Sequence, residues 1–450
     1  MSLLPPRLHM SRLLLPVLAL VALSAAARGG EQNHRLEVTV FDENGLAVAS
    51  ARLTLTRVET QTIIKGETDY AGRCVFSGID AGAYRLKVEK EGFYIATVAD
   101  VRAGETERVE IVLNHHLEFS EYMDVTYSAP AVDPDRTAAT ETLGSSEIIN
   151  LPYPISRDIR SLLPFIPGVV RDFSGNVHVN GSSAGQILSK LDGFNITHPV
   201  SGLFDLRVSA DALRSIEVLG SRYSAEHGKG SGGVLALATR MGDDRYRFSA
   251  TNFIPSVQTR KGLAIDNWTP RATVSGPIYK KRAWFFDAGD AEYNLDIVNE
   301  LPAGADRSNS WRLGNITKAQ VNLSQSNILT ASFLINSFYI DHLGLTRFTP
   351  LETTREASRT AWLYTVKNQS YFSKGVLLEI GMSVNQFRTD EEPLGQSPFR
   401  LTPEGASGNH FETDETYARR AQFIANVIAP PVKWLGRHEV RIGADADHIA

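Results

Sequence analysis

One short motif in this 450-residue sequence has the residue types and spacing of a nucleotide site. Gly228-Lys229-Gly230-Ser231-Gly232-Gly233 fits the pattern GxGxxG. That chemistry needs a helix directly after the glycines, because the helix N-terminus binds the pyrophosphate. The run that follows here, Val234–Thr239, is short, apolar and typical of a strand. We therefore expect no nucleotide site and interpret the glycines as a tight turn that permits close packing.

A second motif, HxxE, occurs twice and is the zinc-binding pair of metallocarboxypeptidases. It is found in His34-Arg35-Leu36-Glu37 and His115-His116-Leu117-Glu118. A zinc hydrolase also needs a third ligand and a glutamate base within a large α/β domain, and no segment alternates helix with strand in that way. We interpret both motifs, and the charge run Asp390-Glu391-Glu392, as solvated polar residues. We therefore expect no metal site, no cofactor, no catalytic residues and no enzyme.

Composition narrows the class of protein further. Hydrophobic residues make up 42% and charged residues 22%, which is ordinary globular usage and excludes a disordered chain. The net charge of −5 argues against a nucleic-acid partner. The single cysteine, Cys74, excludes a disulfide framework within the chain and a multi-cysteine zinc site. All five tryptophans lie in the second half, so the chain has two compositionally different parts.

The first 27 residues are typical of a secretory signal peptide. Arg7 and Arg12 give a positive start, Leu13–Leu23 is an apolar run, and Ser24-Ala25-Ala26-Ala27 offers a cleavage site. The apolar run contains Pro16 and is too short for a membrane-spanning helix, which needs about 20 residues. We expect an exported protein: periplasmic, secreted, or an outer-membrane barrel.

Residues 28–115 are predicted to form a small β-sandwich, because short alternating segments are separated by turn residues. The unit resembles the carboxypeptidase regulatory-like domain, an immunoglobulin- or prealbumin-like sandwich. The match lies in Asp42–Gly45, Asp69-Tyr70-Ala71-Gly72-Arg73 and Ala81-Gly82-Ala83-Tyr84, leading to Gly92-Phe93. Relatives of this sandwich are grouped with carbohydrate-binding folds, but no exposed aromatic platform is evident. Cys74, two residues before Phe76, is expected to be a buried core thiol.

Residues 116–135 are predicted to be a linker, and 136–242 a mixed α+β unit with many glycine turns. In the α+β unit, Asp158–Leu163 is predicted to be a short helix that Pro164 ends. Residues 243–450 contain about nine longer segments with strict alternation of apolar and polar residues, such as Leu378–Asn385. This pattern, with aromatic residues near the strand ends, is typical of an antiparallel transmembrane β-barrel. A soluble sandwich or propeller would alternate in the same way.

The α+β unit resembles the plug of a TonB-dependent receptor. The resemblance rests on Leu163-Pro164…Pro167-Gly168-Val169, Val179-Asn180-Gly181, Leu191-Asp192-Gly193 and the long run Ser215–Val234. The positions that carry the plug motif are Asn180, Gly181, Asp192, Gly193, Glu217, Gly228, Gly232 and Gly233. In this setting we expect the glycine run 228–233 to pack against the barrel wall.

The resemblance implies an outer-membrane receptor or transporter that takes up a siderophore, a glycan or a peptide through a plugged barrel, without enzymatic chemistry. It implies TonB, with its inner-membrane complex, and outer-membrane lipid as partners, and a periplasmic N-terminal domain. TonB would pair by strand addition with an extended stretch before the plug. The candidates for this TonB box are Tyr122, Met123, Asp124, Val125, Thr126 and Tyr127. The alternative is a non-transporting outer-membrane or surface β-protein for binding or adhesion.

Nine strands fall short of the roughly 22 of a plugged outer-membrane transporter. An open edge in lipid would leave backbone groups without partners. We therefore expect either the N-terminal portion of a longer receptor or a truncated gene product.

Overall fold

The computed structural model describes residues 34–90, 93–104, 106–114, 139–151, 158–259, 261–372, 375–430, 432–433, 437–438 and 440–450. The predicted signal peptide and linker lie outside these residues. The chain divides into two compact units, which we describe separately. The first comprises Met1–Val40, Val48–Glu89 and Ile95–Ile111, and the second comprises Phe41–Ala47, Lys90–Tyr94 and Val112–Ala450.

Two sheets that face each other across an apolar core form the N-terminal sandwich. Its strands are β1 (His34–Asp42), β2 (Arg52–Arg57), β3 (Ile63–Glu67), β4 (Arg73–Ile79), β5 (Gly82–Glu89), β6 (Ala96–Ala103) and β7 (Arg108–Leu113). The sheet orders are β4-β1-β7 and β3-β2-β5-β6. Cys74 is 2% exposed among these core residues, as its alternation with Phe76 predicts. At the Asp69–Arg73 turn, the Asp69 carboxylate accepts hydrogen bonds from the backbone N–H groups of Ala71 and Arg73.

A five-stranded mixed sheet, which we call the plug sheet, is the centre of the α+β unit. Its order is β12-β11-β14-β13-β8, with β11 and β14 parallel and the other pairs antiparallel. Its strands are β8 (Ala139–Gly144), β11 (Ile187–Leu191), β12 (Phe194–Asn195), β13 (Leu213–Ser221) and β14 (Gly233–Thr239). A two-stranded sheet joins β9 (Val169–Arg171) to β10 (Val177–Val179).

Short helices connect these strands. They are α2 (Ser145–Asn150), α3 (Ile159–Leu162) and four 3₁₀ turns: η1 (Leu163–Phe165), η2 (Ala184–Gln186), η3 (Ala210–Ala212) and η4 (Ala225–His227). Asp158 caps α3, because its carboxylate accepts the Arg160 N–H. The predicted short helix is present and ends before Pro164, but the chain continues as a 3₁₀ turn that contains this proline. Pro164 stands at the start of η1, where its missing N–H is tolerated.

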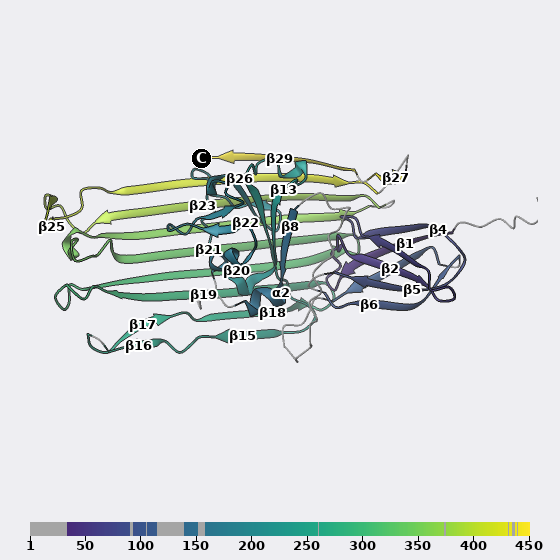
Figure 1. Cartoon of the computed structure of the whole chain (residues 1–450), viewed down its shortest axis with the longest axis horizontal. Coiled ribbons are helices and arrows are strands. Elements are labelled where there is room, and N and C mark those ends of the chain that lie inside the picture. Colours follow the sequence, from purple (N-terminus) through teal and green to yellow (C-terminus); the bar gives the residue numbers. More distant parts are fainter. Residues whose placement is uncertain are drawn as a thin grey trace, which may run out of the picture. The chain divides into compact units, whose positions relative to one another are not determined.

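One large antiparallel sheet, which we call the long-strand sheet, follows the plug sheet in the chain (Figure 1). Its continuous path has nine strands in the order β15-β18-β19-β20-β21-β22-β23-β26-β29, and β16 and β17 lie off this path. The strands of the path are β15 (Arg247–Thr251), β18 (Arg271–Tyr279), β19 (Ala283–Ile297), β20 (Arg307–Ser324), β21 (Asn327–Leu343), β22 (Arg355–Tyr371), β23 (Leu377–Pro393), β26 (Asp414–Ile428) and β29 (Arg441–Ile449). The remaining elements are β16 (Ser256–Gln258), β17 (Ala264–Trp268), η5 (Leu351–Thr353), β24 (Arg400–Thr402), β25 (Gly405–Ser407), β27 (Val432–Lys433) and β28 (Arg437–His438).

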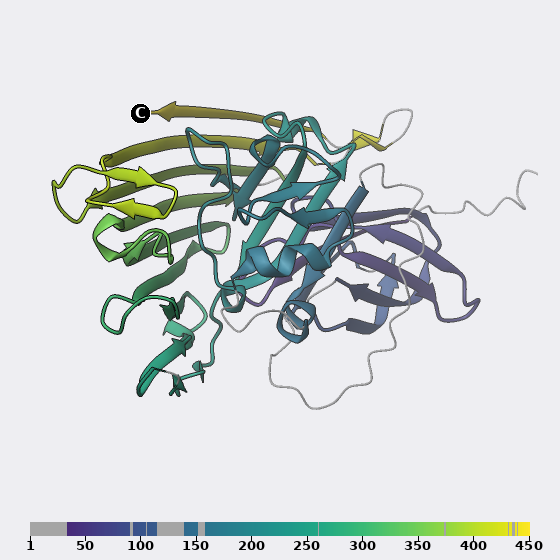
Figure 2. The same cartoon turned by 60° about the vertical axis from the view of Figure 1, so that its left-hand side comes forward.

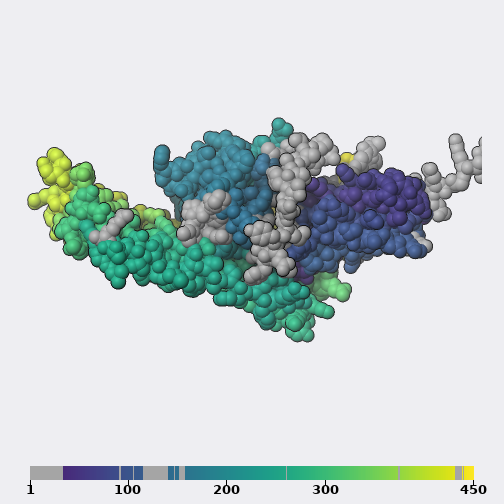
Figure 3. Space-filling view, turned by 60° about the horizontal axis from the view of Figure 1, so that its bottom comes forward, coloured from purple at the N-terminus to yellow at the C-terminus, as the bar shows by residue number. Residues whose placement is uncertain are grey.

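The plug sheet lies against one face of the long-strand sheet, which we call the inner face (Figure 2). The space-filling view shows the blue plug residues seated on the green strands (Figure 3). Successive side chains on a strand point to opposite faces. On β19, Phe286 and Ala288 belong to the core shared with the plug, so Asp287 and Gly289 point to the other face, the outer face.

The two ends of the long-strand sheet differ in the length of their connections. At one end, short turns join β18 to β19, β20 to β21 and β22 to β23, and a longer connection that contains β27 and β28 joins β26 to β29. At the other end, long loops join β19 to β20, β21 to β22 and β23 to β26. In outer-membrane barrels the short turns are periplasmic and the long loops are extracellular. Within the described residues, no helix has the length and apolar character to cross a membrane.

Candidate functional site: the interface between plug and long-strand sheet

A two-residue turn places the first charged group of this interface. β11 and β12 pair through Leu191 and Phe194, so only Asp192 and Gly193 connect them. Their φ angles are +49° and +97°, as a type I′ hairpin turn requires at both central positions. The turn directs the Asp192 carboxylate back toward the end of β14 and toward the long-strand sheet. The predicted plug positions Asp192 and Gly193 are therefore both at the interface.

Asp192 is held by contacts from both sheets. Its carboxylate accepts hydrogen bonds from the Thr239 N–H (2.9 Å) and hydroxyl (2.5 Å), and Lys318 Nζ on β20 lies 2.9 Å from it. Lys367 Nζ on β22 donates to the Asp192 backbone oxygen at 3.2 Å. Burial alone would raise the pKa of Asp192, but the charges of Lys318 and Lys367 and the bonds from Thr239 outweigh it and lower the pKa. Asp192 is therefore an ionised anchor.

Arg207 makes a second, larger cluster of ion pairs. The Arg207 guanidinium lies 2.6 Å from Asp290 and 2.8 Å from Glu292, both on β19, and its side chain is 7% exposed. Its backbone N–H and carbonyl bond the Asn336 side chain on β21. Burial would lower the pKa of Arg207, but Asp290, Asp158 and Glu292 together raise it. The guanidinium therefore stays charged at this buried contact.

A third cluster ties the β11–β12 hairpin to the far strands of the long-strand sheet. Gln422 on β26 accepts the Asn195 N–H at 2.9 Å. Arg420, also on β26, donates to the Thr197 carbonyl at 2.9 Å. Near the edge of the sheet, Lys229 lies 2.5 Å from Asp445 and 2.8 Å from Asp447 on β29. Each cluster pairs a plug group with inward-facing groups of the long strands.

Apolar packing fills the space between these polar clusters. Phe194 is 1% exposed, and its ring lies where a side chain at Gly381 on β23 would be. The shared core also contains Ile316, Leu334 and Leu363 from β20, β21 and β22. A buried salt bridge contributes little net stability by itself. We therefore attribute most of the stability of the contact between the plug and the long-strand sheet to apolar burial. The charged pairs mainly fix the position of the plug on that sheet.

The other predicted plug positions fall in different places. Asn180 has a φ of +48°, and its side chain occupies the space beside Gly168 and Gly220, which explains both glycines. Gly181 follows it in the turn with a φ of +77°. Glu217 alternates with the buried Ile216 and Val218 on β13, so it faces away from the plug core and is not brought into the clusters.

The glycine run has a packing role, but its neighbours differ from those expected. A side chain at Gly232 would lie within 3 Å of Ser182, and one at Gly230 would overlap Leu188. Gly233 has a φ of +144°, and a side chain there would contact Val179. The expectation of packing against the barrel wall is therefore wrong for these three glycines, which pack within the plug itself. Gly228 lies in the same loop, just after η4.

The candidate TonB box, Tyr122–Tyr127, lies outside the described residues. Two loops of the plug, 173–176 and 195–204, belong to the described residues. Phe173 is fully exposed and Val200 is 73% exposed, whereas Ile196 is buried. The His198 ring lies 4.6 Å from the Phe387 ring of β23.

Beside Phe173, Asp172 accepts a bond from the Asn176 side chain, and this and neighbouring bonds lower the pKa of Asp172 to about 2. The bond between His178 and the Ser182 carbonyl, followed by that to Asp172, raises the pKa of His178. This loop therefore carries a small, well-defined polar cluster beside an exposed ring.

Sequence reasoning missed the partners of the plug on the long strands: Asp290, Glu292, Lys318, Arg420 and Gln422. Their signal was present in the alternation, because each falls on the inward face of its strand, on which polar residues are mixed with apolar ones. Alternation predicts which side chains of a strand share one face of the sheet. It does not predict which plug residue each inward side chain contacts. Among the described residues, no group of three or more His, Cys, Asp or Glu side chains is arranged to hold a metal ion.

Comparison with known proteins supports the description of the N-terminal sandwich and that of the plug with its long-strand sheet. Residues 35–114 match the carboxypeptidase regulatory-like domain. Over 250 residues the chain is 27% identical to the TonB-dependent transporter Oar of Myxococcus xanthus, a match that covers 50% of this chain and 23% of the relative. The chain thus spans about a quarter of that relative's length.

Solved receptor structures share the fold. The pyoverdine outer-membrane receptor FpvA of Pseudomonas aeruginosa aligns with 69% of this chain and 46% of its own, at 12% identity and a TM-score of 0.53. The alcaligin receptor FauA of Bordetella pertussis aligns with 70% and 48%, at 14% identity and a TM-score of 0.52. The fold is therefore that of the plug and part of the barrel of TonB-dependent receptors, as predicted. The matched proteins are transporters and receptors rather than enzymes.

Proposed function

We propose that this chain is the N-terminal part of a TonB-dependent outer-membrane receptor that takes up an external ligand by energy-coupled transport. The observation that carries the proposal is the plug sheet held on the inner face of the long-strand sheet by Asp192, Arg207 and their partners. A non-transporting barrel does not need a separate sheet held across its lumen by ion pairs. The homology to a TonB-dependent transporter supports the same assignment.

The proposed domain order is a signal peptide at 1–27, the sandwich at 28–115, a linker at 116–135, the plug at 136–242 and barrel strands from 243. The sandwich lies in the periplasm in this proposal, because it precedes the linker and plug. Transport needs no covalent step. TonB would bind the stretch Tyr122–Tyr127 by strand addition and pull on the plug.

The ligand is proposed to enter from the side of the long loops. Exposed apolar side chains gather there: Phe348 is 50%, Leu401 77% and Phe411 74% exposed. Phe411 lies 5.5 Å from the Phe399 ring and stacks on His410 at 4.9 Å. An aromatic surface of this kind suits a siderophore, a glycan or a peptide.

The test compares binding with accumulation in cells that produce the full-length receptor. One ferric siderophore, one oligosaccharide and one peptide, each labelled, serve as probes, and a deletion of residues 122–127 is compared with an equal deletion of 129–134. The proposal expects that the first deletion abolishes accumulation of the recognised probe but leaves surface binding intact. Binding to the purified periplasmic domain of TonB should be lost in parallel. Surface binding of a probe without accumulation in the undeleted receptor would favour the alternative of a binding or adhesion protein, and accumulation unaffected by either deletion would contradict the assignment of residues 122–127.

A further inference from the structure

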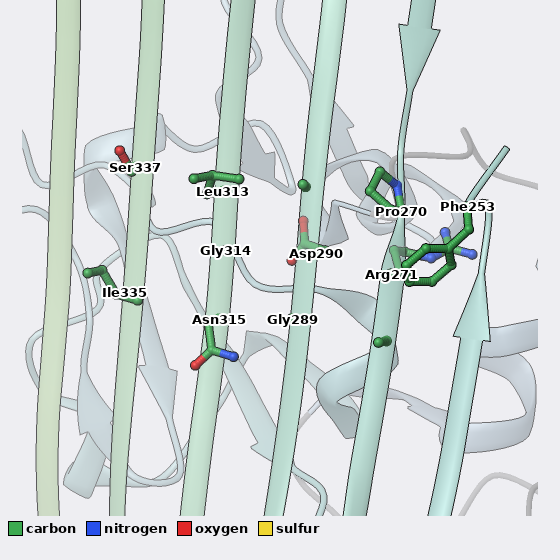
Figure 4. A pocket seen from close by; sticks show the side chains of 12 residues that line it. Phe253, Pro270, Arg271, Gly289, Asp290, Leu313, Gly314, Asn315, Ile335 and Ser337 are labelled. Carbon is green, nitrogen blue, oxygen red and sulfur yellow. The ribbon is translucent and has the colours of Figure 1, made fainter. Parts of the chain in front are cut away.

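The long-strand sheet has a hollow on each face. On the outer face, residues of β18–β21 surround a hollow of about 440 Å³, which Leu313 and Ile335 help to line (Figure 4). It would contact lipid if the proposed function is correct, because it faces away from the plug. A second hollow, of about 670 Å³, is lined by residues that include Arg312, Phe338 and Arg359. We call it the inner hollow, and its size is that of a small-molecule site.

Strand register places the inner hollow on the face that carries the plug. One cross-strand row runs over β19–β22: Glu292, Arg312, Phe338 and Arg359. Side chains that are directly opposite each other across strands share one face. Glu292 contacts Arg207 of the plug, so this face is the inner face. Because β19 continues from Glu292 into a long loop, the hollow lies between the plug and the long loops.

Two guanidinium groups at the plug end of the hollow keep unused donors. The Cζ atoms of Arg312 and Arg359 lie 5.0 and 5.8 Å from the centre of the Phe338 ring, which helps to hold both groups in place. One nitrogen of each donates to a carboxylate, Glu292 at 3.4 Å and Glu391 at 3.2 Å. A guanidinium has five N–H donors, and the two side chains are 43% and 56% exposed. Both can therefore bind a further carboxylate.

The carboxylates that these two groups contact are held more closely by other arginines. Arg207 lies 2.8 Å from Glu292, and Arg355 lies 2.7 Å from Glu391. Both distances are shorter than those to the two exposed arginines. The exposed guanidinium groups are therefore not required to neutralise these carboxylates.

The end of the hollow toward the long loops has the opposite charge. Asp296 on β19 is exposed and lines this end, and Asp266 on β17 also lines the hollow. Between the two ends lie amide and hydroxyl side chains: Asn267, Asn294 and Ser310. The hollow is thus positive near the plug, negative near the loops and able to form hydrogen bonds in between.

The separation of the charged ends matches the length of a short peptide. Arg312 is the cross-strand partner of Glu292, and Asp296 follows Glu292 by four residues. Four residues of a strand extend about 14 Å at roughly 3.4 Å per residue. An extended peptide spans at most about 3.3–3.6 Å per residue, so about four residues cover the same length.

We propose that the inner hollow binds a short peptide with free ends as the ligand for uptake, an inference that rests on the proposed function. The C-terminal carboxylate of the peptide lies at Arg312 and Arg359, and its N-terminal ammonium group lies at Asp296. Charge complementarity favours this occupant. An anionic siderophore would bring negative charge toward Asp296, and a neutral glycan would use neither charged end.

The experiment measures how much peptide the immobilised, purified full-length receptor retains. One random tetrapeptide library is used in three forms: with free ends, with amidated C-termini and with acetylated N-termini. Mass spectrometry should find at least tenfold more of the unmodified form than of either modified form.

Substitutions then test each end of the hollow. Arg312→Gln with Arg359→Gln should reduce retention of the unmodified library at least tenfold and remove its advantage over the amidated form. Asp296→Asn should remove its advantage over the acetylated form. Arg388→Gln is the matched control and should change neither, because Arg388 is 53% exposed but follows the inward Phe387 and so lies on the outer face.

The outcomes separate this inference from the proposed function. Equal retention of the three forms, or retention that the arginine substitutions leave unchanged, overturns the inference. A receptor that retains no peptide but accumulates the ferric siderophore or the oligosaccharide in cells overturns the inference and leaves the proposed function intact. A receptor that retains unmodified peptides as expected but accumulates none in cells supports the binding site and overturns the proposed function.

Discussion

At the scale of single residues, Lys318 is the group on which the Asp192 anchor depends most directly. Its side chain is 11% exposed and that of Asp192 is 15% exposed, so little water reaches the pair. Removing one partner of a buried pair leaves an uncompensated charge, whereas removing both is far less costly. The pair therefore permits a sharp test by double substitution.

Lys318→Met is expected to lower the free energy of plug unfolding by roughly 3–5 kcal/mol. The double variant Lys318→Met/Asp192→Asn should recover a large part of that loss. The measurement is a urea titration followed by a dye on Phe173→Cys in a Cys74→Ser background. Lys65→Met, at an exposed position of the sandwich, is the control and should have no effect. A single variant no less stable than the control would contradict the role of Lys318.

The lowered pKa of Asp192 predicts how plug stability depends on pH. A carboxyl whose pKa is lower in the folded than in the unfolded state stabilises the fold fully above the unfolded value, about 3.9 for Asp. Protonation removes this contribution as the pH falls below that value and through the folded pKa. The same titration should give a lower urea midpoint at pH 3 than at pH 6, with a smaller difference in Asp192→Asn. An equal difference in both proteins would assign the effect to other carboxyls.

At the scale of elements, close packing within the plug explains the glycines of the loop before β14. The space beside Gly232 is filled by Ser182, whereas a side chain at Gly228 would meet its nearest neighbour at an ordinary 3.4 Å. Gly232→Ala is expected to lower the free energy of plug unfolding by about 1–3 kcal/mol through overpacking. Gly228→Ala, in the same loop, should change it by far less. The urea titration compares the two, and equal effects would refute the packing argument.

The elements were largely predictable because their signals are local. Period-two alternation and glycine turns give the nine strands of the continuous path and the hairpin at Asp192-Gly193. The behaviour of Pro164 was not predictable in the same way, since proline both ends an α-helix and starts a 3₁₀ turn. Pairings such as Arg207 with Asp290 join residues 83 positions apart, and no local pattern encodes them.

At the scale of the whole molecule, the proposed transport requires the plug to move against the long-strand sheet. The ion pair of Lys229 with Asp445 offers a place to prevent this. Lys229→Cys/Asp445→Cys in the Cys74→Ser background, joined by a cleavable bis-thiosulfonate, should bind the recognised probe but not accumulate it. Reduction should restore accumulation. Uptake that persists with the link in place would show that the plug need not move at this edge.

The proposed orientation also has a direct test. An epitope inserted between Pro403 and Glu404, in the turn between β24 and β25, should bind antibody on intact cells. The same epitope between Gln325 and Ser326, in the short turn between β20 and β21, should bind only after permeabilisation. The reverse result would invert the assignment of the two ends.

The pairing of the long strands has a consequence for how such a chain diversifies. From β18 to β23 each strand pairs with the next strand in the chain, and the hairpins β24–β25 and β27–β28 are inserted between paired strands without changing a partner. Loop length therefore varies without shifting the register of the strands that hold the plug. In the proposed receptor, the loops that contact the ligand can therefore be exchanged one at a time, while the inner face, with its matched charges, stays constant.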